Sequence, residues 1–162
     1  MPEVLFAPWR YEYLVAEKSK TCIFCEALAS TDEDKSLIVY RGRRVFALLN
    51  RYPYTNGHLM VAPYDHHSRL SQSDGETRTE LIETVARAEK ILSDTYRTDG
   101  LNIGVNLGSA AGAGVEDHYH VHLVPRWSGD TNFMTVAGGV RVVPEELSVT
   151  RARLAPLFRV QP

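Results

Sequence analysis

Three histidines occupy alternate positions in one short stretch of the sequence: His118, His120 and His122. The residues that separate and follow them are apolar or aromatic: Tyr119, Val121, Leu123 and Val124. Alternate side chains of a β-strand project to opposite faces, so this period predicts a strand with three imidazoles on one face and a core-facing apolar side. Near neutral pH an imidazole serves as base, nucleophile, metal ligand or hydrogen-bond donor to phosphate. The stretch therefore predicts a chemical site.

Three interpretations of that site differ in how the histidines act. One metal ion bound by all three is poor geometry, because successive rings on a strand face lie about 7 Å apart and the outer rings about 13 Å apart. A second interpretation divides the work: His120 attacks an electrophile while its neighbours orient it and bind developing charge. A surface strand with fortuitous histidines is the third. It leaves unexplained the glycine-rich stretch 107–115, whose backbone N–H groups suit a bound anion.

The only two cysteines lie close together, at Cys22 and Cys25. Their spacing fits a zinc site, a redox pair or two buried thiols. The N-terminus lacks a basic segment followed by an apolar one, which argues against a signal peptide and against a structural disulfide. We therefore expect a cytoplasmic protein in which the pair binds a metal or does redox chemistry.

The composition is that of a soluble globular protein of one domain, with 162 residues and 44% hydrophobic residues. A net charge of −2 gives no overall attraction to nucleic acid or to an anionic membrane. No apolar run approaches the roughly 18 residues of a membrane-spanning helix. We expect neither nucleic acid nor membrane as a partner, so local groups must hold any phosphate-bearing ligand.

Apolar residues at helical spacing predict three helices. A short one covers Cys22 to Ala29 after Thr21 as its cap, and one at the C-terminus begins at Pro144. The longest ends before Gly100 and carries a stripe for the core or a subunit contact: Leu81, Ile82, Val85, Ala88, Ile91, Leu92 and Tyr96. Two alternative capping boxes fit its first turn: Ser73 with Glu76, or Thr77 with Glu80.

Short apolar runs predict strands at 37–40, 45–49, 58–62 and 101–106 in addition to the histidine strand. Arg41-Gly42-Arg43 predicts a hairpin turn, and 31–35 and 64–67 read as loops. Several antiparallel strands with segregated helices indicate an α+β domain.

The segment His118–Val124 resembles the histidine triad (HIT) family, since it matches the pattern His-φ-His-φ-His-φ-φ, with φ apolar, at every position. The resemblance covers roughly residues 20–128 and includes Gly57-His58 and the strand–turn–strand before it. It implies a HIT-like α+β fold, with an antiparallel sheet, a long helix and a C-terminal helix. Residues 1–20 would form an N-terminal arm and 21–162 a single HIT domain with a C-terminal extension.

The resemblance also implies a mechanism. His120 would attack the α-phosphorus of a nucleotide and form a nucleotidyl-histidine, with its other nitrogen held by the carbonyl of His118. His122 would donate to the phosphate oxygens, helped by backbone N–H groups near Gly112 and Gly114. The remaining substrate-binding residues that the resemblance implies are Asn50 at the ribose, His58 at the site wall, and Asn106 and Trp127 at the phosphates.

Related proteins bind a structural zinc through two cysteines and two histidines, so the resemblance implies one here. The ligands would be Cys22, Cys25, His66 and His118, and a shift of one residue would substitute His67 for His66.

Within the family, the N-terminal arm and the run from Pro125 to Met134 are similar to the bacterial branch that cleaves diadenosine tetraphosphate by hydrolysis or phosphorolysis. The alternatives are a nucleoside phosphoramidase or general nucleotide hydrolase, or a nucleotide-binding module with little turnover. This chain departs from related members at Ala113-Gly114, where they often carry Gly-Ser or a glutamine, which leaves the acceptor open between water and phosphate. The resemblance also implies a homodimer.

Overall fold

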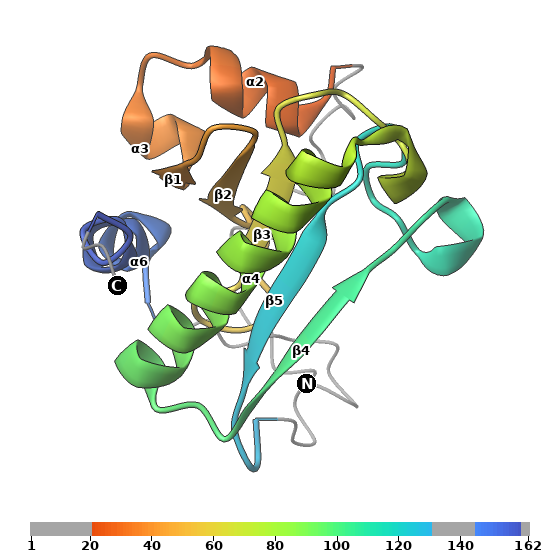
Figure 1. Cartoon of the computed structure of the whole chain (residues 1–162). Coiled ribbons are helices and arrows are strands. Elements are labelled where there is room, and N and C mark those ends of the chain that lie inside the picture. Colours follow the sequence, from red (N-terminus) through yellow and green to blue (C-terminus); the bar gives the residue numbers. More distant parts are fainter. Residues whose placement is uncertain (1–20, 131–144, 160–162) are drawn as a thin grey trace, which may run out of the picture.

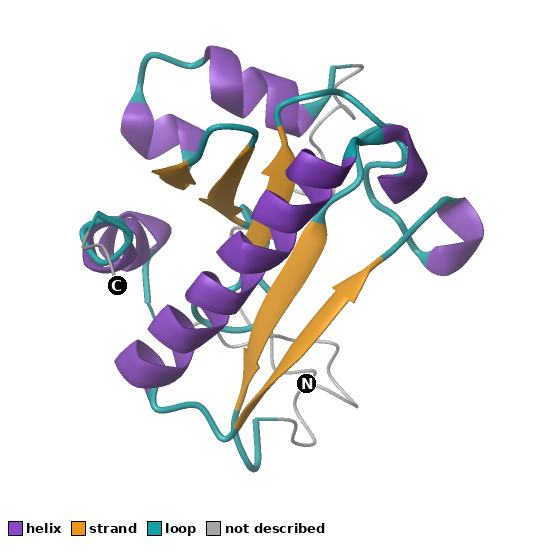
Figure 2. Cartoon of the chain, in the orientation of Figure 1, coloured by secondary structure: helices purple, strands orange, loops and turns teal. Residues whose placement is uncertain are grey.

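The strand-forming runs of the sequence pair into one antiparallel sheet of five strands. The computed structural model describes residues 21–130 and 145–159. The expected N-terminal arm and the expected helix start at Pro144 lie outside these ranges. Strands are arranged in the order β1-β2-β3-β5-β4 (Figures 1 and 2). Their bounds are Ile38–Arg41 for β1, Val45–Leu49 for β2, Leu59–Pro63 for β3, Gly100–Val105 for β4 and Val121–Arg126 for β5. The expected α+β class is confirmed.

Helix α4, Gly75–Tyr96, lies across one face of this sheet (Figure 1). The expected stripe is largely confirmed, because Leu81, Val85, Ala88 and Leu92 are buried against the strands. The position of Ile82 was predicted wrongly: its side chain is 61% exposed, since it lies one residue beyond the stripe on the outer side of the helix.

Both expected capping boxes of α4 are wrong. Its N-cap is Asp74, whose carboxylate accepts the Thr77 N–H at 2.7 Å. Glu80 instead reaches the β1–β2 hairpin and accepts the N–H groups of Arg43 and Arg44 at 2.7 and 3.1 Å. A side chain at Gly42 would press against that carboxylate, which explains the glycine in this turn.

The end of α4 also differs from the expectation. The helix stops at Tyr96, and Arg97 adopts the left-handed conformation with φ of 49°, whereas Gly100 begins β4. The left-handed residue that ends the helix is therefore an arginine, although glycine is the residue usually found there.

Three shorter α-helices lie around the sheet within the described residues. Helix α2, Ile23–Ala29, follows Cys22 as its N-cap, so the prediction of Thr21 as cap is wrong. Residues 31–35 are not simply a loop, because Asp32 caps the one-turn helix α3, Glu33–Ser36. Helix α6, Leu147–Leu154, lies beside β1, where Arg151 donates to the Ile38 carbonyl. The 3₁₀ turns are η1, Leu70–Gln72, and η2, Ser109–Ala111. In the described ranges, no helix is long and apolar enough to cross a membrane.

The histidine stretch is a strand only in its second half. β5 begins at Val121, so the prediction that His118 and His120 lie within it is wrong. The apolar side was predicted correctly, since Tyr119, Val121 and Leu123 all join the core beneath α4. A second cluster on the opposite face of the sheet includes Phe24 of α2 and four residues of β2 and β3: Phe46, Leu48, Met60 and Ala62.

Candidate active site and metal site

His120 is held in one protonation form by the backbone before it. Its side chain is 4% exposed, and its Nδ1 lies 2.9 Å from the carbonyl oxygen of His118. Because a carbonyl oxygen only accepts hydrogen bonds, Nδ1 carries the proton and Nε2 keeps its lone pair. Burial lowers the pKa of His120 to about 4. The ring is therefore neutral at pH 7 and has a free nitrogen that can act as a nucleophile.

His122 is held in the complementary form through His58, which is 1% exposed. The backbone N–H of Tyr54 donates to His58 Nδ1 at 3.1 Å, which leaves the His58 proton on Nε2. That Nε2 lies 3.0 Å from His122 Nδ1 and donates to it. The His122 proton must then be on Nε2, and burial lowers the pKa of this ring as well. His122 thus offers a neutral N–H donor.

The two rings lie next to each other in different states. Their centroids are 4.6 Å apart and their planes cross at 75°. A neutral nucleophile beside a fixed N–H donor suits attack on a phosphoryl group, whose oxygens need a donor as the new bond forms.

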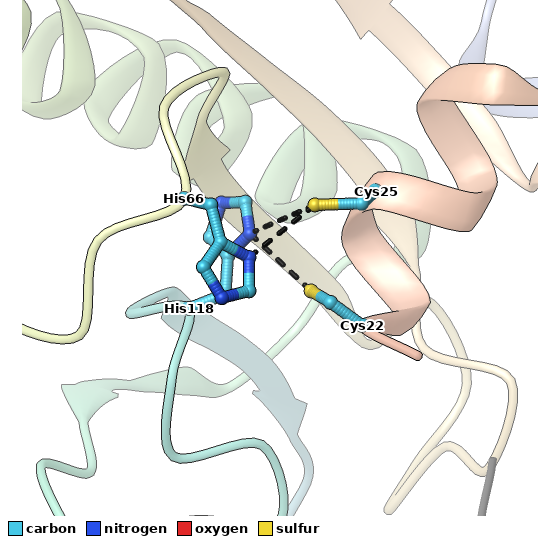
Figure 3. A group of neighbouring side chains, drawn as sticks. All are labelled: Cys22, Cys25, His66 and His118. Carbon is cyan, nitrogen blue, oxygen red and sulfur yellow. Dashed lines mark hydrogen bonds between the residues drawn. The ribbon is translucent and has the colours of Figure 1, made fainter. Parts of the chain in front are cut away.

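The His118 ring lies against the two cysteines, as Figure 3 shows. Its Nε2 donates to the Pro63 carbonyl at 2.9 Å, so its Nδ1 keeps a lone pair, 3.4 Å from Cys22 Sγ. His66 Nδ1 lies 3.3 Å from Cys25 Sγ. The three histidines of the triad therefore do not share one task.

The four side chains that approach one another here fit a tetrahedral zinc site. Their ligand atoms lie within 4.8 Å of one another: those of Cys22, Cys25, His66 and His118. Ligands about 2.0–2.3 Å from a zinc ion would be separated by about 3.3–3.8 Å, so only a small contraction is needed. Both cysteines are free thiols. His66 rather than His67 belongs to this group, because the ring nitrogen that lies with the other three ligand atoms is that of His66. His67 contributes its backbone carbonyl, which accepts the Tyr119 N–H at 2.7 Å.

Helix α2 also brings an aromatic ring into the site. Phe24 is fully buried, and its ring centroid lies 5.0 Å from that of His118 and 4.6 Å from that of His120. The same helical turn therefore contacts both the metal-site histidine and the histidine with the free nitrogen.

The expected substrate-binding residues are placed unequally. Asn50 follows β2 directly, and its Oδ1 accepts the Tyr52 N–H at 2.9 Å, which leaves the amide N–H groups to donate. Asn106 follows Val105, the register partner of Val121, so it lies level with His120. Trp127 lies five residues beyond His122, about 16 Å along β5, and its indole N–H donates to the Tyr96 carbonyl. The structure does not bring Trp127 beside the histidines of its own chain.

The loop before the histidines uses some of its own backbone donors. Gly112 has a φ of 82°, which favours glycine, and its N–H donates to the Ser109 carbonyl at 2.9 Å. A side chain at Gly114 would meet open space. A side chain at Gly112 would also meet open space, so the two glycines differ only in that the Gly112 N–H already has an acceptor. That both help to bind phosphate stays a prediction.

Sequence reasoning missed three contributors to the site. The Pro63 carbonyl determines which nitrogen of His118 carries the proton, and the Tyr54 N–H does the same for His58. Both are backbone groups, so the residue types give no indication of them. Phe24 had a signal, because it stands between the two cysteines of an expected metal site.

Comparison with known proteins agrees with this geometry. The HIT domain family matches residues 31–129. A Mycobacterium tuberculosis protein named AP-4-A phosphorylase is 40% identical over an alignment that covers 98% of this chain and 85% of that protein.

Solved structures show the same fold. A zinc-bound histidine triad family protein from Mycobacterium smegmatis aligns with a TM-score of 0.68 and 26% identity, covering 86% of this chain and 94% of that one. Plasmodium falciparum diadenosine triphosphate hydrolase aligns with a TM-score of 0.62 and 16% identity, covering 79% and 76%, which supports the fold alone. The chain belongs to the histidine triad family.

Proposed function

We propose that this chain cleaves dinucleoside polyphosphates, diadenosine tetraphosphate among them, through a nucleotidyl-histidine on His120. The observation that carries the proposal is the pairing of a bare His120 Nε2 with the His122 N–H, each fixed by a hydrogen bond on the ring's other nitrogen. The 40% identity to the M. tuberculosis AP-4-A phosphorylase supports the choice of substrate.

In the first step, the lone pair of His120 Nε2 attacks the α-phosphorus of one nucleotide. A P–N bond forms, and the bond from that phosphorus to the bridging oxygen breaks, so that ATP leaves from diadenosine tetraphosphate with the electron pair. His122 donates to a non-bridging oxygen as its charge grows. The positive charge that develops on the His120 ring is stabilised by the His118 carbonyl, which accepts a hydrogen bond from the Nδ1–H group.

In the second step, an acceptor oxygen attacks the phosphorus and returns the lone pair to His120. Water as acceptor releases AMP, and inorganic phosphate releases ADP. The loop between β4 and β5 has alanine and glycine at 113 and 114, so a backbone N–H there, or Ser109, would orient the acceptor. Asn50 would bind the ribose and Asn106 the phosphates. His58 would form part of the site wall beside the leaving group.

We also propose that Cys22, Cys25, His66 and His118 bind a structural zinc ion. With four protein ligands the site is closed, so the ion would anchor α2 to the sheet and take no part in the phosphoryl chemistry. The zinc-bound histidine triad protein of M. smegmatis supports this assignment. Freshly purified protein should contain about one zinc per chain, and Cys22→Ser should lower that content.

The homodimer is proposed at the edge of the sheet formed by β4. Among the strands that the structure describes, β4 has a neighbour on one side only, and Ile103 is 46% exposed. Joining two β4 edges would pair their free backbone groups and cover this side chain. Sedimentation should show a dimer, and Ile103→Lys should shift it toward monomer.

Product analysis with diadenosine tetraphosphate tests the reaction. ADP with ATP in the presence of phosphate indicates phosphorolysis, and AMP with ATP in its absence indicates asymmetric hydrolysis. Two ADP without phosphate would contradict attack at the α-phosphorus. Faster cleavage of adenosine phosphoramidate would favour the phosphoramidase alternative, and binding without any product would favour a nucleotide-binding module.

A further inference from the structure

The contact between Phe24 and His120 is not required by the zinc site or by the triad chemistry. The phenyl ring lies 4.6 Å from the imidazole, and the two planes are inclined by 38°. Phe24 is fully buried and His120 is 4% exposed, so both ring faces are removed from water where they meet.

One hydrogen bond alone does not fix the direction of the His120 nucleophile. The bond from Nδ1 to the His118 carbonyl fixes one atom of the ring, and the outer torsion of a histidine side chain is broad. Rotation about the outer side-chain torsion would move Nε2 away from the phosphorus. Ring contacts limit this freedom: the His122 ring crosses the imidazole plane at 75°, and Phe24 lies against the imidazole at an inclination of 38°.

Helix α2 determines where Phe24 lies. Cys22 and Cys25 flank it at close range and approach His118 and His66 through their sulfur atoms. Any shift of this turn would move the phenyl ring relative to both His118 and His120.

We propose that Phe24 is a positioning residue for His120: its ring holds the imidazole plane so that Nε2 points at the phosphorus. This rests on the proposed function of His120 as the nucleophile. Because a nucleophile displaced by about 1 Å reacts up to about 100-fold more slowly, loss of the phenyl ring should slow adduct formation by about 10- to 100-fold.

Phe46 provides a matched control. It is also fully buried and belongs to the same apolar cluster, and among the described residues its ring contacts those of Phe24 and Tyr64. A Phe46→Leu variant removes a similar volume from the same cluster without removing the ring that contacts His120.

The test compares Phe24→Leu, Phe24→Met and Phe46→Leu with the wild-type protein. The Met variant nearly preserves the side-chain volume, so it stands in if the Leu variant fails to fold. Three quantities are measured: the single-turnover rate of adduct formation from diadenosine tetraphosphate, the Kd of AMP by calorimetry, and the zinc content.

Both Phe24 variants should form the adduct at least about tenfold more slowly, with the Kd of AMP and the zinc content within about twofold of wild type. Phe46→Leu should change the adduct rate less than about threefold. A wild-type adduct rate in Phe24→Met would overturn the proposal, as would a loss of rate that occurs only together with loss of zinc. If wild-type protein forms no adduct, the proposed function itself fails, and the role of Phe24 fails with it.

Discussion

Replacing His58 tests whether the protonation of His122 is imposed by its neighbour. His58→Phe keeps a ring of similar size in this fully enclosed position but removes the N–H that donates to His122 at 3.0 Å. The imidazole of His122 is then free to carry its proton on Nδ1, and in that form it has no donor to offer to a phosphate oxygen.

The size of the effect follows from the burial of the bond. An acceptor left unpaired in a buried site costs about 1–3 kcal/mol, and each 1.36 kcal/mol corresponds to a tenfold change in rate. We therefore expect the single-turnover rate of His58→Phe to fall by about 5- to 150-fold. His58→Gln retains an N–H donor in the position of Nε2 and should lose less than about fivefold.

Two measurements address this prediction together. Rapid-quench kinetics give the rate of adduct formation, and the ¹⁵N chemical shifts of the His122 ring report which nitrogen carries the proton. In wild type the proton should be on Nε2, and in His58→Phe a mixture should appear. A wild-type rate and an unchanged Nε2–H signal in His58→Phe would refute the chain of hydrogen bonds from Tyr54 to His122.

Three further predictions follow from the same structure. Burial lowers the pKa of His122 below its ordinary value of 6.5, so the unfolded chain binds this proton more readily. The free energy of unfolding should therefore decrease as the pH drops below about 6.5, and it should decrease less in His122→Asn than in wild type. Urea denaturation midpoints at pH 7 and pH 5 measure this difference. Chelation of zinc should lower the melting temperature of wild type, but not of Cys22→Ser, in a thermal-shift assay. Glu80→Ala should lower the free energy of unfolding by about 0.5–1.5 kcal/mol, because two hairpin N–H groups lose their carboxylate acceptor.

Each of these has a result that would contradict it. An equal change in the urea midpoint between pH 7 and pH 5 in wild type and His122→Asn would mean that the pKa of His122 is the same in the folded and unfolded chain. An unchanged melting temperature after complete metal removal would mean that the ion does not anchor α2. A loss below about 0.5 kcal/mol in Glu80→Ala would mean that water replaces the carboxylate at the hairpin turn.

The sequence predicted the site best at residues whose side chains are reactive or bind metals, namely the histidines and cysteines. The histidine spacing indicated the pair His120 and His122, and the cysteine pair indicated two of the four side chains that meet in the metal site. The apolar alternation at Tyr119, Val121 and Leu123 correctly indicated the side that faces α4, because alternate side chains of an extended backbone project to opposite faces.

The sequence predicted least where the tertiary fold chooses between similar local options. Glu80 had the spacing of a capping residue, but the hairpin brought near it offers two unpaired N–H groups, and Asp74 was free to cap α4. His118 leaves the strand direction because the Pro63 carbonyl and the cysteines bind its two nitrogens. Neither outcome is encoded within a few residues of the position concerned.

The covalent intermediate on His120 is the central claim, and trapping it is the most direct measurement. Wild-type protein mixed with diadenosine tetraphosphate labelled at the α-phosphorus is quenched in base, where a phosphorus–nitrogen bond on histidine survives, and then analysed by peptide mass spectrometry. We predict one nucleotidyl group, located on His120, lost on acid treatment and absent from His120→Asn. Cleavage of the substrate at the wild-type rate by His120→Asn, or a label on any other residue, would contradict the account.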